Sequence, residues 1–274
     1  MVSFPPCKIN LGLSVLSKRA DGYHNLQTCF FPIPWHDVLE IIRAETFHFT
    51  STGNTIAGNP DENLCVKAYR LLKNEFDLDP VQIHLHKIIP SGAGLGGGSS
   101  DAAYTLRLLN DIFSLNLNGQ VLMDYAARLG SDCAFFVQDK PMVGSGRGEI
   151  LKEISLSLND KFLVVVKPNI HVSTADAFAT IQPALTAQSI EEIVLTYPIS
   201  KWRKFLKNDF EETVFKKHPA IQLLKEKLYS LGASYAAMSG TGSAVYGIFD
   251  GEVNVSHQFP GATTWAGFPD LVKG

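Results

Sequence analysis

The sequence predicts an α+β fold, because strand patterns and helix patterns are mixed without a strict strand–helix–strand rhythm. A second observation is the stretch from Gly92 to Gly98, where five of seven residues are glycine, between a strand pattern and a helix pattern. A third is the length of 274 residues, enough for one large domain or two smaller ones. A polar turn before a new apolar strand places the boundary near residue 155, so we expect domains at 1–155 and 156–274.

Charge and composition exclude several classes of protein. Lys and Arg total 24 and Asp and Glu total 27, so the net charge of −3 gives no overall attraction for nucleic acid or an anionic membrane. No segment approaches the roughly 18 unbroken apolar residues of a membrane span, and the N-terminus lacks a basic leader. Cys7, Cys29, Cys65 and Cys133 form no Cys-x-x-Cys pair. We therefore expect a reduced, cytoplasmic protein without a structural metal, a nucleic-acid partner or a membrane partner.

The first eighty residues contain mostly strand patterns and one helix. Alternation predicts a strand over 7–17 and one or two strands over 37–52, with a polar loop over 20–28 and a long turn over 52–64. A helix is expected over 62–76, because Leu64, Ala68 and Leu72 share one helical face. Asp61 is its expected N-cap.

The segment 81–90 predicts a half-buried strand that leads into the glycines. Val81, Ile83 and Leu85 alternate with polar residues. We expect the other face to hold Gln82, His84, His86 and Lys87, and expect the two histidines to face solvent rather than a metal, since no third ligand is evident.

Helices dominate the remaining pattern. They are expected from the glycines to about Ile112, over 119–130 and over 220–231, where Gly232 is placed to end the last helix. Residues 235–249 resemble a hairpin.

The glycine-rich stretch predicts a phosphate site, with a purely structural turn as the alternative. Pro90 fixes the entry of the chain, and Ser99, Ser100 and Asp101 offer N-cap side chains to the helix that follows. Successive backbone N–H groups before a helix N-terminus bind anions, and missing side chains let phosphate oxygens reach them.

Two common phosphate motifs do not explain this stretch. The Walker sequence is missing from it. Gly92, Gly94 and Gly97 have the spacing of the dinucleotide fingerprint, but strands of a doubly wound sheet are buried on both faces, and segment 81–90 has a polar face. We therefore interpret the match as accidental.

Three segments resemble the motifs of the GHMP small-molecule kinases, named for galactokinase, homoserine kinase, mevalonate kinase and phosphomevalonate kinase. "PPCKINLGLSV" near the N-terminus resembles the first motif, "PSGAGLGGGSSDAA" the second and "MSGTGSAVYGIF" the third. They occur in order, so the resemblance covers nearly the whole chain. It implies a two-domain α+β GHMP kinase fold with the active site in the cleft between the domains, and the use of ATP with Mg²⁺.

Within this family the chain is most similar to the branch that phosphorylates a cytidine-diphosphate alcohol in non-mevalonate isoprenoid synthesis. The segments that carry this similarity are "KINLGL", "ADGYHNLQT", "LGSDCAFFV" and "GRGE". The chain departs from that branch at Cys7, where alanine is common, and at Cys133 and Ala134, where Val-Pro is usual. These departures change packing beside the site and remove no functional group.

The resemblance assigns the chemistry to Lys8 and Asp132. Taken alone, Lys8 is a strand lysine of the kind that is usually solvated, and Asp132 could be an N-cap. By resemblance, Asp132 accepts the proton of the substrate hydroxyl and Lys8 stabilises the developing negative charge.

The resemblance also implies two sets of binding residues. The expected ATP-binding residues are Asn63, Pro90, Ser91, Gly92, Ala93, Gly94, Leu95, Gly96, Gly97, Gly98, Ser99 and Ser100, with Ser99 or Ser100 also contacting Mg²⁺ unless both are only helix caps. The expected substrate-binding residues are Asn10, Tyr23, His24, Phe178, Gly240 and Gly242. Tyr23 would stack on the cytosine, His24 would bond its edge and Phe178 would cover the other face. The two glycines could equally be hairpin residues.

Two other functions remain open. A GHMP kinase of mevalonate or homoserine type would share the three motifs, and "ADGYHNL" speaks against it. A non-catalytic nucleotide-binding or Rossmann-type protein would not need both Lys8 and Asp132. The sequence does not indicate an oligomeric state.

Overall fold

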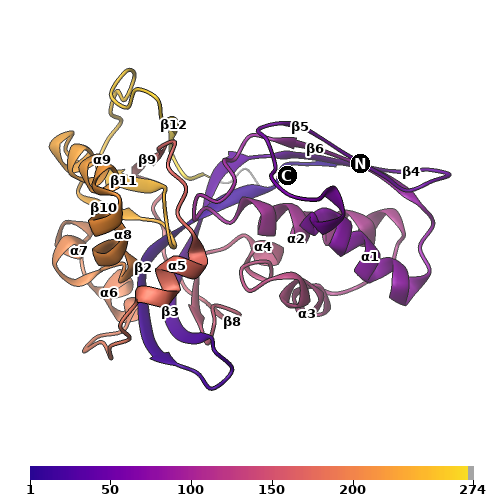
Figure 1. The fold of residues 1–274 in the computed structure, drawn as a ribbon, viewed down its shortest axis with the longest axis horizontal. Coiled ribbons are helices and arrows are strands. Elements are labelled where there is room, and N and C mark those ends of the chain that lie inside the picture. The colour runs from indigo at the N-terminus through magenta and orange to yellow at the C-terminus, as the bar shows by residue number, and fades with distance from the viewer. Residues whose placement is uncertain (271–274) are drawn as a thin grey trace. The chain divides into compact units, whose positions relative to one another are not determined.

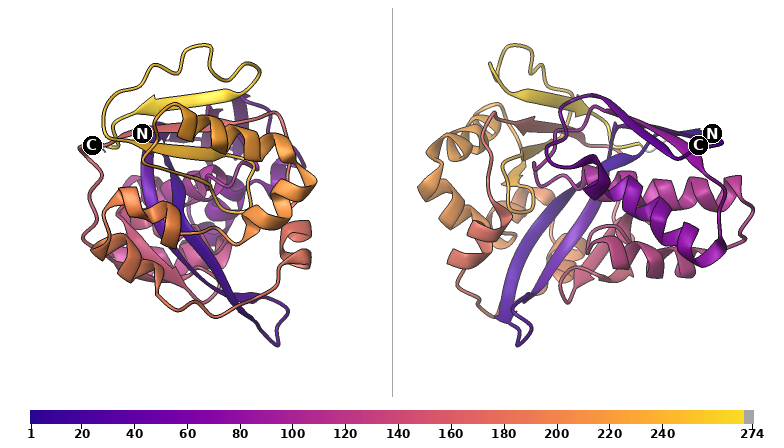
Figure 2. Two further views of the ribbon diagram at one scale, coloured as in Figure 1. Left: turned by 90° about the vertical axis from the view of Figure 1, so that its left-hand side faces the viewer. Right: turned by 45° about the vertical axis from the view of Figure 1, so that its right-hand side comes forward.

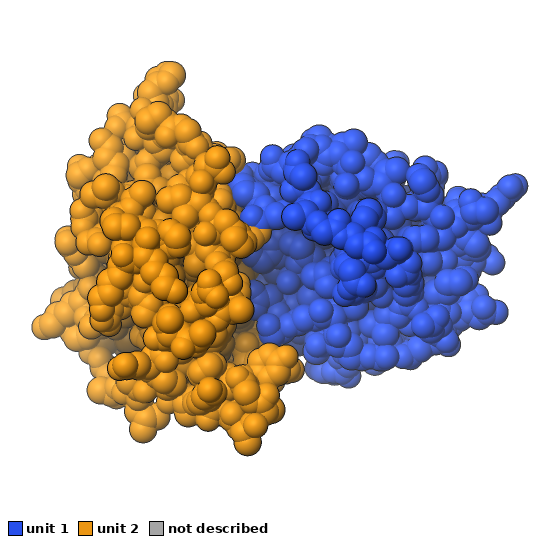
Figure 3. All heavy atoms as spheres, viewed as in Figure 1, with its two compact units in different colours: residues 1–7, 35–91, 96–140 blue, residues 8–34, 92–95, 141–274 orange. Residues whose placement is uncertain are grey.

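The structure, a computed structural model, describes residues 1–270 and divides into two compact units (Figure 3). Unit 1 comprises Met1–Cys7, Trp35–Ser91 and Gly96–Lys140, and unit 2 comprises Lys8–Pro34, Gly92–Leu95 and Pro141–Gly274. Each unit is assembled from separated stretches, so the units do not follow one cut in the chain. The family domains expected at 1–155 and 156–274 stay a prediction.

Unit 1 consists of a sheet with helices over one of its faces (Figure 1). The strand order is β1-β4-β6-β5; β4 is antiparallel to β1 and β6, and β5 is parallel to β6. The strands are β1 (Val2–Ser3), β4 (Val38–Arg43), β5 (His48–Gly53) and β6 (Val81–Lys87). The helices are η1 (Pro60–Glu62), α1 (Leu64–Phe76), α2 (Gly97–Ile112), α3 (Gly119–Leu129) and α4 (Phe135–Gln138).

The starts of two helices correct the predicted caps. The side chain of Asn63, not Asp61, caps α1 by accepting a hydrogen bond from the backbone N–H of Cys65 at 2.9 Å. Helix α2 begins at Gly97, and its N-cap is Gly96, which has no side chain to offer and a φ of 69°. Ser99, Ser100 and Asp101 therefore lie inside the first turns of α2 rather than before it. A left-handed glycine can end the loop without a side-chain cap.

Strand β6 has the predicted alternation, but Lys87 was assigned to the wrong face. Residues two apart share a face of a strand, so Lys87 lies with Val81, Ile83 and Leu85. Its exposed fraction is only 3%. The other face does carry His84 and His86, whose rings hydrogen-bond the hydroxyls of Thr50 and Thr52.

Unit 2 holds most of a sheet with the order β2-β3-β7-β8 and a second, wholly antiparallel sheet with the order β10-β11-β9-β12. In Figure 2 the long strands β2 and β3 run side by side. The strands are β2 (Pro6–Lys18), β3 (His24–His36), β7 (Met142–Ser145), β8 (Ile150–Glu153), β9 (Phe162–Lys167), β10 (Tyr235–Met238), β11 (Val245–Phe249) and β12 (Thr263–Gly267). The helices are α5 (Thr174–Thr180), α6 (Ile190–Thr196), α7 (Ile199–Phe205), α8 (Phe210–Lys217) and α9 (Pro219–Ser230).

The structure confirms the hairpin and the last helix, and it corrects one loop. β10 and β11 pair as an antiparallel hairpin, and α9 ends before Gly232, whose φ is 99°. The polar loop predicted over 20–28 becomes strand at His24, because Leu26 and Thr28 alternate inward and are buried. None of the helices within residues 1–270 has the length and apolar character needed to cross a membrane.

Candidate active site

The backbone of the third motif packs closely against the glycine-rich stretch. A Cβ at Gly94 would lie 2.0 Å from the carbonyl oxygen of Ser239, and a Cβ at Gly240 would lie 3.3 Å from Cα of Gly94. The N–H of Ala244 donates to the carbonyl of Ala93 at 3.0 Å. The segments 92–95 and 239–244 are therefore packed backbone to backbone within unit 2, which requires glycine at position 94.

Gly240 and Gly242 also have a structural reason to be glycine. Both have positive φ, 55° and 90°, which L-residues with side chains rarely adopt. A Cβ at Gly242 would lie 2.7 Å from Sδ of Met238. Their contact with substrate stays a prediction.

Lys8 is held against this pair of segments. Its ammonium donates to Oδ1 of Asn10 at 2.6 Å and to the carbonyl of Gly94 at 3.2 Å, and it lies 5.2 Å from the ring centroid of Phe30. Because β2 alternates, Lys8 and Asn10 share a face, as predicted. The exposed fraction of Lys8 is 3%, so its position is fixed before any ligand arrives.

Asn10 orients this lysine. Its Oδ1 accepts from Lys8, and its Nδ2 donates to Oγ1 of Thr28 at 2.9 Å. Ser239, which the sequence analysis missed, donates to the same Gly94 carbonyl at 2.8 Å. The amide of Asn10 is thus used within the protein, and its predicted contact with substrate stays a prediction.

Asp132 lies in unit 1 with Ser99 and Cys133. It precedes Cys133 in the turn between α3 and α4. Burial raises the pKa of the Cys133 thiol to about 12; a hydrogen bond with Ser99 lowers it and the nearby Asp132 carboxylate raises it. The carboxylate that we predict as the base therefore lies near the start of α2, where the predicted phosphate site ends.

The two serines at the start of α2 differ in access. Ser100 is fully buried, and its hydroxyl has no hydrogen-bond partner among residues 1–270. Ser99 is partly exposed. Of the two serines, Ser99 is therefore the one that keeps exposed surface, although its side chain also hydrogen-bonds Cys133.

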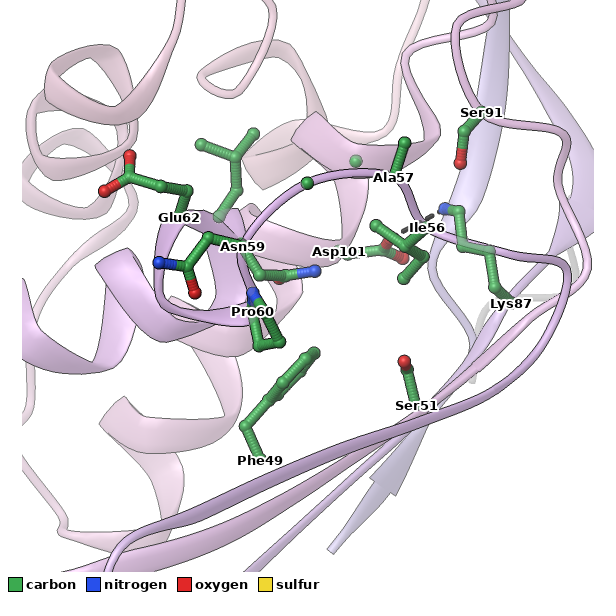
Figure 4. A pocket seen from close by; sticks show the side chains of 14 residues that line it. Phe49, Ser51, Ile56, Ala57, Asn59, Pro60, Glu62, Lys87, Ser91 and Asp101 are labelled. Carbon is green, nitrogen blue, oxygen red and sulfur yellow. Dashed lines mark hydrogen bonds and ion pairs between the residues drawn. The ribbon is translucent and has the colours of Figure 1, made fainter.

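A pocket of about 240 Å³ lies wholly within unit 1 (Figure 4). Three of the predicted ATP-binding residues line it: Asn63, Ser91 and Gly98. The other lining residues are Phe49, Ser51, Ile56, Ala57, Gly58, Asn59, Pro60, Glu62, Leu64, Lys87 and Asp101. An apolar wall with a few polar groups suits a flat heterocycle, so this pocket supports Asn63 as a neighbour of the adenine.

The predicted cytosine-binding residues belong to unit 2. Tyr23 is 56% exposed, and the guanidinium of Arg147 lies 5.0 Å from its ring centroid. The ring of His24 stacks on that of Phe178 at a centroid distance of 5.3 Å, and Phe178 contacts Phe210 edge to face at 4.7 Å. The rings of His24 and Phe178 therefore stack on each other, whereas the ring of Tyr23 is exposed. Arg147, in "GRGE", had not been singled out as a site residue.

Comparisons with known proteins identify the family of the chain. The family described as "GHMP kinases N terminal domain" matches residues 63–140, and the one described as "GHMP kinases C terminal" matches residues 199–258. A protein of Cytophaga hutchinsonii named 4-diphosphocytidyl-2-C-methyl-D-erythritol kinase is 51% identical over 94% of this chain and 96% of its own length. The chain belongs to the GHMP kinases, in the 4-diphosphocytidyl-2-C-methyl-D-erythritol kinase family.

Further comparisons distinguish members of the same family from proteins that share the fold alone. A Bacteroides fragilis protein of the same name is 51% identical over 93% of this chain and 94% of its own length. A crystal structure of 4-(cytidine 5'-diphospho)-2C-methyl-D-erythritol kinase superposes with a TM-score of 0.80 at 30% identity, covering 97% of this chain and 98% of that one. A homoserine kinase from Cytophaga hutchinsonii reaches a TM-score of 0.69 at 14% identity over 96% and 94% of the two chains, which shows a shared fold alone. The chain is therefore an ATP-dependent phosphotransferase of the α+β GHMP fold, and the Rossmann-type alternative is not supported.

Proposed function

We propose that this kinase transfers the γ-phosphoryl group of ATP to the 2-hydroxyl of 4-diphosphocytidyl-2-C-methyl-D-erythritol. The observation that carries the proposal is that the three motifs meet at one atom. The carbonyl oxygen of Gly94, in the second motif, accepts from Lys8 of the first motif at 3.2 Å and from Ser239 of the third at 2.8 Å. The names of the 51% identical relatives support the choice of alcohol.

An assay of ADP release tests the substrate. The purified chain is given ATP and Mg²⁺ with 4-diphosphocytidyl-2-C-methyl-D-erythritol, mevalonate or homoserine in separate reactions. We expect turnover with the cytidyl alcohol alone. Turnover with mevalonate or homoserine would instead assign the chain to another branch of the GHMP kinases, and turnover with none of them would contradict the proposal.

Each proposed catalytic group has a position suited to its task. Asp132 accepts the proton of the attacking hydroxyl, and Lys8, whose ammonium is fixed by Asn10, stabilises the negative charge that develops. Phosphoryl transfer asks a protein mainly to position groups and to stabilise charge. A lysine fixed before substrate arrives meets the second requirement without reorganisation.

Mg²⁺ fits best at Ser99. A bound Mg²⁺ would neutralise charge on the phosphates of ATP. Mg²⁺ keeps several waters and takes few protein ligands, so a partly exposed hydroxyl such as that of Ser99 suits it better than the buried hydroxyl of Ser100. Ser100 would then serve the packing of α2.

We also propose a cytoplasmic location. All four cysteines lie within the described residues, where each is buried and none forms a disulfide. Such a set of thiols is typical of proteins kept in a reducing compartment.

Gly98→Val is expected to weaken ATP binding without damaging the fold. Among residues 1–270, a Cβ at Gly98 would meet only Cδ1 of Leu64 outside its own helix turn, at 4.0 Å, so a side chain there projects into the pocket of unit 1. Overpacking of about 1–3 kcal/mol would raise the KM for ATP by about 5- to 150-fold. Gly96 is unsuitable for this test, because its φ of 69° would itself strain valine.

Gly119→Val is the matched control for Gly98→Val. Gly119 also lies in the first turn of a helix of unit 1, and in the described part of the chain a Cβ there would meet only Nε2 of Gln138, at 3.6 Å. The KM for ATP should be unchanged in this control. If folded Gly98→Val has an unchanged KM for ATP, then ATP does not bind in the pocket of unit 1.

Tyr23→Ala is expected to raise the KM for the cytidyl alcohol and to leave that for ATP unchanged. Loss of one base–aromatic stack costs about 1–3 kcal/mol, or about 5- to 150-fold in affinity. Tyr23 is 56% exposed, so the fold should tolerate the change. His24→Ala should act in the same direction. Phe268→Ala removes another exposed aromatic ring of unit 2 and should change neither constant; a shift in the KM for ATP alone would place Tyr23 at the nucleotide instead.

A further inference from the structure

Three charged side chains meet in the interior of unit 1, and we call them the buried ion triad. They are Asp37, Lys87 and Asp101, with exposed fractions of 0%, 3% and 2%. The Lys87 ammonium donates to Oδ2 of Asp37 and, at 2.7 Å, to Oδ2 of Asp101. Burial opposes the charge on Lys87, but the two carboxylates outweigh it and raise its pKa. The lysine is therefore charged and already paired.

Asp37 fixes the chain where it enters the glycine-rich stretch. Its Oδ1 accepts hydrogen bonds from the backbone N–H groups of Ile88 at 2.6 Å and Ile89 at 2.8 Å. These are the first two residues after β6, and Pro90 follows them. One carboxylate thus holds both Lys87 and the segment that leads to the glycines.

Lys87 fixes the chain where it leaves the stretch. A Cβ at Gly97 would lie 2.9 Å from Nζ of Lys87, so the ammonium lies against the first turn of α2 and occupies the space of a side chain there. Asp101 is four residues further along α2, one turn away on the same face. A side chain at position 97 would collide with this lysine and with Ile89, which gives glycine there a structural reason.

The triad borders the pocket that we assign to ATP. Lys87 and Asp101 both line it, and Figure 4 shows the nitrogen of Lys87 between Asp101 and Ser91. Buried ion pairs are often replaced by apolar residues without loss of stability, so stability alone is a weak reason for three charges here. A stronger reason is that the triad holds the chain on both sides of the glycine-rich stretch, at residues 88–89 and at the first turn of α2.

We propose that Asp37, Lys87 and Asp101 are positioning residues for ATP, which hold residues 88–91 and 96–101 at the spacing that binds the nucleotide. The inference rests on the proposed function only in naming ATP as the ligand. Lys87 already has two carboxylate partners, so its proposed role is to hold the two segments rather than to pair with the phosphates.

Two variants test the triad. Asp101→Asn keeps the shape and removes one charge. Lys87→Met combined with Asp101→Asn removes the ion pair and leaves Asp37 with its two backbone donors; circular dichroism checks that this variant is folded. We expect the KM for ATP and the dissociation constant of ATP measured by calorimetry to rise by about 5- to 150-fold, the factor that corresponds to about 1–3 kcal/mol for the loss of a charged hydrogen-bond partner. The KM for the alcohol should be unchanged.

Asp139→Asn is the matched control. Asp139 forms an ion pair at 2.8 Å with Arg107 of α2, the helix that also carries Asp101, and it lies outside residues 88–91 and 96–101. Its KM for ATP should equal that of the unchanged chain. The inference is overturned if the folded triad variants bind ATP normally, or if both KM values rise equally, as general damage to the fold would cause. Turnover of the cytidyl alcohol by the unchanged chain tests the proposed function separately; absence of ATP binding by that chain would overturn both.

Discussion

Asp132→Asn is expected to lower kcat by about two to four powers of ten, the usual contribution of a positioned base. Asparagine keeps the shape and can still hydrogen-bond, but it cannot take the proton of the hydroxyl. Binding of ATP and of the cytidyl alcohol should persist, since the change removes an interaction made in the transition state. Steady-state kinetics and calorimetric titration of each ligand would separate the two effects.

Lys8→Met extends this test. It keeps the apolar stem beside Phe30 and removes the charge that Asn10 holds, so kcat should again fall. Combined with Asp132→Asn, the loss should be far smaller than the product of the single losses, because both residues serve one transition state. Asp124→Asn, an exposed aspartate on α3, should have no effect.

A folded Asp132→Asn variant with near-normal kcat would show that the aspartate is structural. The kinase would then rely on positioning and electrostatic stabilisation alone, a route that phosphoryl transfer permits. Its assignment to the GHMP kinases would be unaffected.

The sequence was sufficient for features that depend on local periodicity. Alternation along 7–17 placed Lys8 and Asn10 on one face, and the structure joins their side chains at 2.6 Å. The order of the three motifs indicated the fold, because each motif has its own local signature. The same periodicity rule, applied strictly, would also have placed Lys87 with Val81 and Ile83 on the buried face.

Features that depend on contacts between residues far apart in the chain could not be predicted from the sequence. Nothing local to Gly94 indicates that the carbonyl of Ser239 lies where its side chain would be, and nothing local to Gly97 indicates the ammonium of Lys87. The sequence analysis considered a phosphate site or a structural turn, and neither interpretation included these close approaches from distant parts of the chain. The cap at Gly96 was missed for a related reason, since its backbone φ of 69° replaces the side-chain cap that serines would offer.

Gly94→Ala is expected to damage both stability and activity. Its φ of 78° alone costs an alanine about 1–2 kcal/mol. Its Cβ would also lie 2.0 Å from the carbonyl oxygen of Ser239, so the segments 92–95 and 239–244 must separate. We expect overpacking to add about 1–3 kcal/mol to the loss in the free energy of unfolding. Urea denaturation would measure that loss.

Gly261→Ala isolates the contribution of φ. Gly261 also lies in unit 2, its φ is 76°, and no atom of the described residues, apart from Gly261 and its two neighbours, lies within 4 Å of the position of a Cβ. The free energy of unfolding of this variant should fall only by the cost of the positive φ, about 1–2 kcal/mol. Its kcat should be unchanged. Gly94→Ala should in addition lower kcat, because the Gly94 carbonyl is the shared acceptor of Lys8 and Ser239. Equal losses of stability in the two variants, with kcat unchanged in both, would mean that the close packing of the motifs is unimportant to the site.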